Sequence, residues 1–300
     1  MKRAAWTRRA APWIVGFAVT CQLAAMAMLV RGHDQGIPPY GYWREAIVNG
    51  LVYAGLAFLL ASKGPDNPIS WIVVALAMVG ALQLLTGEYA FFASDGGEHV
   101  TFSVRFAGWF SDVCQSLFVT LVLLLLLLFP TGRPATPRWR VLGWGIVTGA
   151  LVGLLLQTIE PGTVAGLRGV ERPFALDRRP RLLDAVAFGA LALWGGAALG
   201  VIASLIVRFR RSDGVERAQL KWLVYAATIG IAVLMAPLPL SEDAGALLWA
   251  LVPASISGSI GIAVLKYRLY DVDVLINRTL VYGALTAILA ATYVGLVTAA

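Results

Sequence analysis

Long apolar runs alternate with short polar connections along almost the whole chain. A helix needs about 17–25 apolar residues to cross a hydrocarbon layer of about 30 Å. In lipid, an α-helix satisfies its backbone hydrogen bonds within one segment, so the pattern predicts an all-α, polytopic transmembrane helical bundle of about nine spans. The predicted spans are Ala11–Val30, Glu45–Ala61, Pro68–Phe92, Ala107–Phe129, Arg140–Gln157, Leu183–Val207, Leu220–Leu240, Ala244–Leu265 and Thr279–Ala300.

The connection between the last two predicted spans, Lys266–Arg278, is short and charged. Its apolar residues recur at nearly helical spacing; they are Leu269, Val272, Leu275 and Ile276. This pattern is typical of a short amphipathic helix that lies along a membrane surface. The alternative is a solvated loop.

Composition excludes an ordinary soluble domain. Hydrophobic residues make up 59% of the chain and charged residues 14%, whereas soluble domains average about 45–50% and about 25%. The net charge of +7 raises the possibility of nucleic-acid binding. However, the basic residues are divided among the connections and form no continuous phosphate-binding stripe, so we predict the lipid bilayer as a partner and no nucleic acid.

The distribution of basic residues predicts the orientation in the membrane. With a cytoplasmic N-terminus, about two thirds of the 24 Lys and Arg residues fall in inner connections, while most of the 17 acidic residues fall outside or at outer helix ends. An excess of Lys and Arg on the cytoplasmic side is the usual rule for membrane proteins. The longest connection, Thr158–Leu182, is assigned to the outside although it is rich in Arg.

Small residues recur at intervals of four in several spans, as at Gly145, Gly149 and Gly153 in the fifth. Such a row lets two helices approach closely in lipid. We predict packing within one chain rather than a dimer face for this row.

Four carboxylates define the only candidate binding region. Each is predicted near an outer helix end, among aromatic residues such as Trp109 and Phe110. One interpretation is an outward-facing sensing pocket for a cation, a lipid headgroup or a small ligand; the other is interfacial anchoring by carboxylates and aromatic side chains. The four residues are Glu88, Asp112, Glu160 and Asp184.

Catalytic chemistry has no support in the sequence. The two histidines, His33 and His99, are both assigned to outer connections without cysteine or histidine neighbours at metal-ligand spacing. Cys21 and Cys114 fall within apolar runs, and no phosphate-binding, dinucleotide-binding or serine-hydrolase motif is present. We therefore predict no catalytic, metal or cofactor site within residues 1–300.

Four segments have a characteristic sequence: LFPTGRPATPRWR at Leu128–Arg140, GVERAQLKWLVYA at Gly214–Ala226, NPISWIVVALAM at Asn67–Met78 and, the most specific, LKYRLYDVDVLINRTLVYGALTA at Leu265–Ala287. Together they resemble the N-terminal membrane region of actinobacterial sensor histidine kinases. The resemblance implies that residues 1–300 are a sensory or anchoring domain in the plasma membrane. Further spans and a cytoplasmic kinase module are then expected after residue 300.

This resemblance also implies partners that the chain itself does not display. They are a second copy in a homodimer, a response regulator bound through the kinase module, and ATP with Mg²⁺ in that module. The charged residues of Lys266–Arg278 would form the signal-relay connector; they are Arg268, Asp271, Asp273 and Arg278. Two alternatives remain: a small-solute transporter or channel, and the same membrane domain joined to a different output domain. The absence of a charge near the centre of any span counts against ion-coupled transport.

Overall fold

The computed structural model is helical throughout the residues that it describes, apart from connecting turns and one isolated β-bridge. These residues are 2–63, 67–95, 99–134, 136–164, 167, 169–178, 180–235 and 255–262. The named helices are α1 (Lys2–Asp34), α2 (Trp43–Lys63), α3 (Pro68–Ala93), α4 (Phe102–Leu128), the 3₁₀ turn η2 (Pro137–Trp139), α5 (Arg140–Ile159), α6 (Arg181–Arg211) and α7 (Gly214–Met235).

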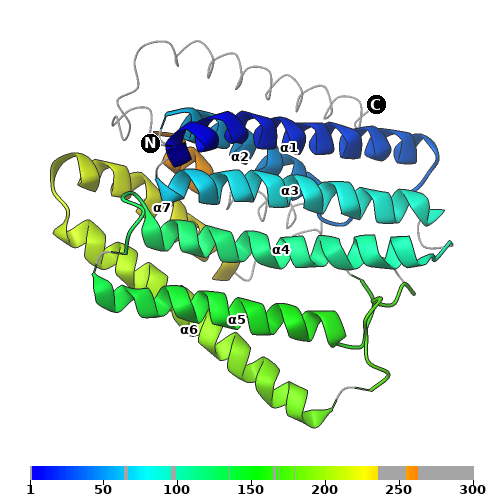
Figure 1. The fold of residues 1–300 in the computed structure, drawn as a ribbon. Coiled ribbons are helices and arrows are strands. Elements are labelled where there is room, and N and C mark those ends of the chain that lie inside the picture. Colours follow the sequence, from blue (N-terminus) through cyan, green and yellow to red (C-terminus); the bar gives the residue numbers. More distant parts are fainter. Residues whose placement is uncertain are drawn as a thin grey trace.

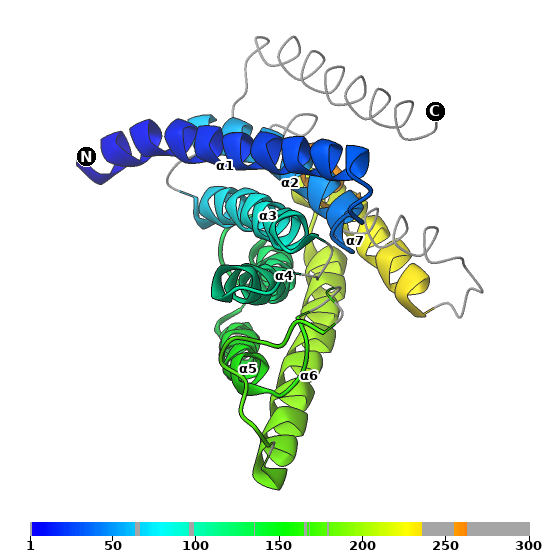
Figure 2. The same cartoon turned by 90° about the vertical axis from the view of Figure 1, so that its right-hand side faces the viewer.

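The first four helices form the most closely packed part of the bundle. α3 lies in the middle and packs against α1, α2 and α4, while α5 continues the stack beyond α4 (Figures 1 and 2). α6 packs along α5 but diverges from the others toward one end, and α7 turns back beside its opposite end (Figure 1).

Local sequence signals explain where α3 and α4 begin. The Asn67 side chain accepts a hydrogen bond from the backbone N–H of Ile69 at 3.0 Å, with Pro68 in the first turn. Thr101 caps α4 in the same way through the N–H of Val104. Asparagine and threonine caps satisfy amide groups that the first helical turn leaves without partners, and proline in that turn removes one such donor.

The turn that follows α4 packs against the start of α3. Gly132 has a φ of 74°, a conformation that favours glycine, and a Cβ atom there would lie 2.7 Å from the Asn67 side-chain oxygen. The glycine therefore serves both the turn and the close contact with the cap of α3.

A continuous apolar core holds α2, α3, α4 and parts of α6 and α7 together. Fully buried side chains at its centre include Tyr53, Leu76 and Leu125. α2 and α3 approach closely where Gly80 meets Gly50, with a distance of 3.6 Å from the ideal Cβ position of Gly80 to the Cα of Gly50. Small residues at such a crossing bring helix backbones together and increase their van der Waals contact.

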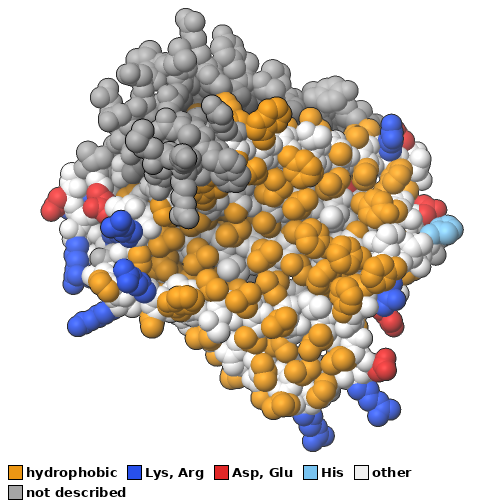
Figure 3. All heavy atoms as spheres, viewed as in Figure 1, with side chains coloured by type: hydrophobic (Ala, Val, Ile, Leu, Met, Phe, Trp, Pro, Cys, Tyr) orange, Lys and Arg blue, Asp and Glu red, His pale blue; other side chains and the backbone are white. Residues whose placement is uncertain are grey.

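Six predicted spans are confirmed as helices long and apolar enough to cross a membrane. A broad apolar surface separates two charged ends of the molecule, as expected for a hydrocarbon-facing belt (Figure 3). The chain is therefore a helical membrane protein. The six segments are Pro12–Asp34, Trp43–Leu60, Pro68–Ala93, Phe102–Leu128, Pro137–Ile159 and Arg181–Arg211.

The total of about nine spans and the cytoplasmic N-terminus remain predictions. α7 includes most of the predicted span Leu220–Leu240, and the helical residues 255–262 lie within Ala244–Leu265. The span Thr279–Ala300 and the connector Lys266–Arg278 lie outside the described residues.

Candidate functional site

The four predicted carboxylates lie at the same end of the bundle but in different surroundings. Glu88 and Asp112 are 3% and 5% exposed, inside the packing of α3 and α4. Glu160 follows α5 and lines a cavity, whereas Asp184 is exposed in the first turn of α6. The structure therefore brings only one of the four to a cavity.

Glu88 helps to hold the connection between α1 and α2. Its carboxylate accepts a hydrogen bond from the backbone N–H of Tyr40 at 3.3 Å. The Tyr40 ring packs on Gly87 and makes an edge contact with Phe91, at 6.0 Å between ring centroids. Burial raises the pKa of the Tyr40 phenol above its ordinary value, and the charge of Asp112 adds to this, so the phenol stays neutral.

Polar side chains join the first four helices in pairs. Gln22 of α1 donates a hydrogen bond to the Ala46 carbonyl of α2 at 3.1 Å. Ser111 of α4 donates to the Gln83 carbonyl of α3 at 2.9 Å, and the Gln83 amide donates to the Gln115 side chain of α4 at 2.5 Å. Buried bonds of this kind fix the relative position of neighbouring helices because each lost partner leaves a polar group in apolar surroundings.

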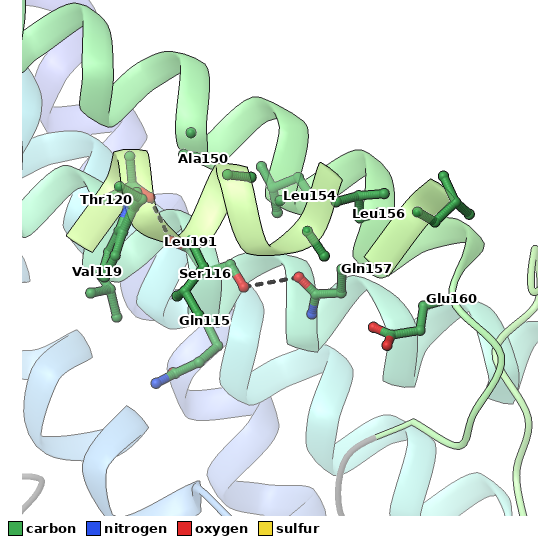
Figure 4. A pocket seen from close by; sticks show the side chains of 16 residues that line it. Gln115, Ser116, Val119, Thr120, Ala150, Leu154, Leu156, Gln157, Glu160 and Leu191 are labelled. Carbon is green, nitrogen blue, oxygen red and sulfur yellow. Dashed lines mark hydrogen bonds between the residues drawn. The ribbon is translucent and has the colours of Figure 1, made fainter. Parts of the chain in front are cut away.

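A cavity of about 400 Å³ lies between α4, α5 and α6 (Figure 4). It extends from the middle of these helices toward the end that carries Glu160. Its walls are mostly apolar, with several uncharged polar groups from α4 and α5. The lining residues are Gln115, Ser116, Val119, Thr120, Gly149, Ala150, Gly153, Leu154, Leu156, Gln157, Glu160, Leu183, Ala187, Ala190, Leu191 and Trp194.

The glycine row of α5 explains where the cavity begins. Cβ atoms at Gly145 and Gly149 would lie 3.3 Å from Ala197 and 2.9 Å from Trp194, so both glycines pack closely against α6, as predicted. A Cβ atom at Gly153 would meet nothing within 4 Å. The prediction of close helix packing is therefore wrong for Gly153, because α6 has diverged from α5 at this level.

One hydrogen bond crosses the cavity wall from α4 to α5. The Ser116 hydroxyl donates to the Gln157 side-chain oxygen at 2.9 Å (Figure 4). Farther toward the helix end, the Glu160 carboxylate forms an ion pair with Arg172 at 3.6 Å. The cavity thus has an uncharged polar wall and, at its rim, a carboxylate whose charge is balanced.

The connection from α5 to α6 folds over the beginning of α4. The backbone N–H of Val164 donates to the Val170 carbonyl at 2.9 Å, and both side chains are buried in a cluster with Tyr40 and Phe91. Arg105 of α4 supports the same loop through bonds to two of its backbone carbonyls, those of residues 171 and 172. This long connection therefore has a structural role in capping the bundle.

Arg208 organises the opposite end of the molecule. Its guanidinium donates hydrogen bonds to the Phe129 carbonyl, to the Arg133 carbonyl at 2.9 Å and to the Thr131 hydroxyl at 3.3 Å. It also forms an ion pair with Glu216 of α7 at 3.7 Å. Arg208 therefore joins the end of α6 to the turn after α4 and to the beginning of α7, a junction that the sequence did not reveal.

The other predicted residues take no part in a described site. His33 and His99 lie at the end opposite to Arg208, and within the described part of the chain no cluster of potential ligands could hold a metal ion. Cys21 and Cys114 are buried free thiols. The connector residues fall outside the described ranges; they are Arg268, Asp271, Asp273 and Arg278.

Sequence reasoning missed Ser116 and Gln157 as members of a site. Their only sequence signal is a polar side chain in an otherwise apolar helix. Ser116 lies in the middle of α4, where a lone serine is easily accommodated, and Gln157 lies near the end of α5, where polar residues are common. Comparison with known proteins gave no match to a family model, to a curated protein or to a solved structure.

Proposed function

We propose that this chain is the membrane-embedded sensory and anchoring region of a two-component sensor histidine kinase in the plasma membrane. The proposal begins from the four sequence segments that resemble such kinases. The kinase module that follows would supply the phosphoacceptor histidine, bind ATP and Mg²⁺, dimerise, and transfer phosphate to a response regulator.

The junction at Arg208 is the observation that carries the proposal. It links Leu128–Arg140 with the beginning of Gly214–Ala226, two of the segments on which the resemblance rests. These segments are far apart in the sequence, and they meet at the end of the bundle opposite to the cavity. A change in the packing of α6 would therefore act on both segments together.

A signal in this scheme changes the balance between two packing arrangements of α5 and α6. Such a change counts as signalling only if the stimulus and the kinase both bias the same equilibrium. Arg208 lies at the end of α6, where a displacement of that helix would reach α7 and the segments that follow it.

A transporter or channel for small uncharged solutes is the second candidate. The cavity favours this function because a transported solute needs a binding site within the membrane. Between the cavity and Arg208, however, α4, α5 and α6 are packed around Leu125, Ile146 and Val201, each fully buried. This apolar layer supports sensing over conduction.

The test uses the complete reading frame that contains this chain. We expect the sequence after residue 300 to encode a phosphoacceptor histidine and an ATP-binding domain, and membranes containing the protein to incorporate phosphate from ATP into histidine. Arg208→Ala should change this rate severalfold, whereas Arg210→Ala, which changes an exposed neighbour, should not.

Two results would contradict the proposal. If a different domain follows residue 300, the membrane region belongs to a protein with another output domain, which is the remaining alternative from the sequence. Equal kinase activity and response with and without residues 1–300 would remove the sensory role and leave only anchoring.

A further inference from the structure

The polar groups of the cavity offer hydrogen-bond donors. Gln157 uses its side-chain oxygen to accept from Ser116, and Gln115 uses its oxygen to accept from Gln83. Neither amide nitrogen has a hydrogen-bond acceptor among the described residues. Each side-chain amide carries two N–H donors. In Figure 4 the Gln157 amide lies among the lining side chains, whereas the Gln115 amide points away from them, so Gln157 is the residue that leaves donors without protein partners at the cavity wall.

The same cavity is less suited to a charged ligand than to a neutral one. Glu160 is the only charged residue among the lining residues of the described chain, and Arg172 already balances it at 3.6 Å. A cationic ligand would have to compete with this arginine. A neutral ligand that accepts a hydrogen bond would use the free amide donors without disturbing any existing contact.

The remaining surface and the size indicate a compact apolar molecule. Leu154, Ala190 and Trp194 provide much of the wall, and about 400 Å³ falls within the range of about 300–1,000 Å³ found for small-molecule sites. Leu191 lines the cavity and is also 66% exposed, ten residues into the apolar span of α6. The cavity therefore reaches the surface within the membrane-spanning part of the protein.

We propose that this cavity binds a neutral, membrane-soluble molecule about the size of two fused or linked rings, with a carbonyl or ether oxygen that accepts a hydrogen bond from the Gln157 amide. The apolar body of the molecule packs against Leu154, Leu191 and Trp194. This inference concerns binding alone and does not rest on the proposed kinase role. It would hold equally if another output domain followed.

Benzophenone is a suitable probe because it has one carbonyl oxygen between two phenyl rings. On irradiation, its excited ketone removes hydrogen from a nearby C–H group, and the two carbon radicals join, so that the ketone becomes a tertiary alcohol attached to the protein. The full chain in lipid nanodiscs is irradiated with benzophenone, digested and mapped by mass spectrometry. We expect saturable labelling of Leu154 and Leu191.

Filling the cavity should abolish this labelling. Gly153→Leu places a side chain in the open space beside Gly153, and we expect saturable labelling to fall at least tenfold. Gly189→Leu is the matched control, because Gly189 of α6 also has nothing within 4 Å of its Cβ position but does not line the cavity. Circular dichroism and thermal unfolding of both variants verify that each is folded.

The hydrogen bond is tested with diphenylmethane, which has the same two rings without the oxygen. Unlabelled benzophenone should compete with the photolabel about five- to tenfold better than diphenylmethane, a ratio consistent with one neutral hydrogen bond. In Gln157→Leu this ratio should fall to about one, while diphenylmethane competes as well as before. Comparing two ligands within each variant separates the hydrogen bond from any general loss of folding.

Clear outcomes would overturn the inference. Labelling that does not saturate, or that is the same in Gly153→Leu and Gly189→Leu, would show that the cavity is not a binding site. A ratio of competition that stays unchanged in Gln157→Leu would show that the ligand is held by its apolar surface alone.

Discussion

The bundle formed by α1–α4 and the pair formed by α5 and α6 bury their apolar residues to different extents. In an apolar 18-residue stretch of each span, 50%, 56% and 44% of residues are buried in α2, α3 and α4, but 17% in Pro137–Ile159 and 28% in α6. α1 is itself only 28% buried, so the well-covered part of the first region is α2, α3 and α4. The second exposes most of its apolar surface, and it also contains the cavity.

The difference shows how one membrane protein can combine a rigid part with an adjustable one. Polar contacts join α1 to α2 and α3 to α4 inside the first region. Between α4 and α5 the described chain has the bond from Ser116 to Gln157, and glycines provide the close contacts between α5 and α6. Because few polar contacts hold α5 and α6 beside the cavity, we expect the packing of these two helices, away from the junction at Arg208, to respond most to a ligand.

The largest effect is expected where α3 meets the connection before α2. In Gly87→Ala, the new Cβ would lie 2.7 Å from carbons of the buried Tyr40 ring. Overpacking of this kind costs typically about 1–3 kcal/mol, and we expect about 3 kcal/mol here because the ring has no free space to move into. The measurement is unfolding by SDS in mixed micelles, followed by circular dichroism.

Gly55→Ala is the control for this substitution. A Cβ atom at Gly55 of α2 meets nothing within 4 Å, and alanine favours a helix by about 1 kcal/mol over glycine. This variant should be at least as stable as the wild type. If both variants were destabilised equally, the rigid packing attributed to α1–α4 would not hold at this contact.

The second effect concerns the link between the two regions. Arg208→Ala removes the bonds to the Phe129 and Arg133 carbonyls and the ion pair with Glu216. Hydrogen bonds to charged groups contribute about 1.5–3 kcal/mol each, but this site is partly exposed, so we expect a total loss of about 2 kcal/mol. Hydrogen exchange should increase in residues 129–134 and at the start of α7.

Two controls make this result specific. Arg208→Lys keeps the charge but loses the planar arrangement of donors that reaches two carbonyls, so it should restore only part of the protection. Arg210→Ala should leave exchange unchanged. Unaltered exchange in Arg208→Ala would mean that the turn and α7 are held in place without this residue.

The sequence predicted the helices well because an apolar run of this length has few other structures available in lipid. Asn67 followed by Pro68 even marked the first residue of α3. The cavity could not be predicted in this way, since it depends on the divergence of α6 from α5. Gly149 and Gly153 belong to the same row of glycines at intervals of four residues. Gly149 nevertheless packs on Trp194, whereas Gly153 borders open space.

The candidate site was predicted only in part for a related reason. Hydropathy placed Glu88, Asp112, Glu160 and Asp184 near one membrane surface, and their helix ends do lie at one end of the bundle. Whether each carboxylate is buried, exposed or at a cavity depends on which helix face it occupies and on what covers that face. The loop containing Val164 covers part of α4, and no local pattern in the sequence specifies that contact.

A smaller effect is expected from the bond between the two regions. Ser116→Ala removes the hydrogen bond to Gln157, and bonds between membrane helices contribute about 0.6 kcal/mol on average and at most about 2 kcal/mol. We expect about 1 kcal/mol in SDS unfolding. Thr158→Ala is the control, because its hydroxyl bonds to the Leu154 carbonyl of the same helix; a loss as large in this variant would contradict an interhelical role for Ser116.

The smallest effect is expected on the exposed face of α5. Leu155 is 68% exposed, whereas Leu84 of α3 is fully buried. Leu84→Ala should cost about 2 kcal/mol, the lower end of the range for such truncations, because it leaves a cavity but loses no transfer free energy relative to lipid. Leu155→Ala should change the free energy of unfolding by less than about 0.5 kcal/mol, since lipid chains occupy the released space and are as apolar as leucine. A cost above about 2 kcal/mol for Leu155→Ala would show that protein, and not lipid, covers this face, and the contrast between the two regions would then reflect a missing contact rather than looser packing.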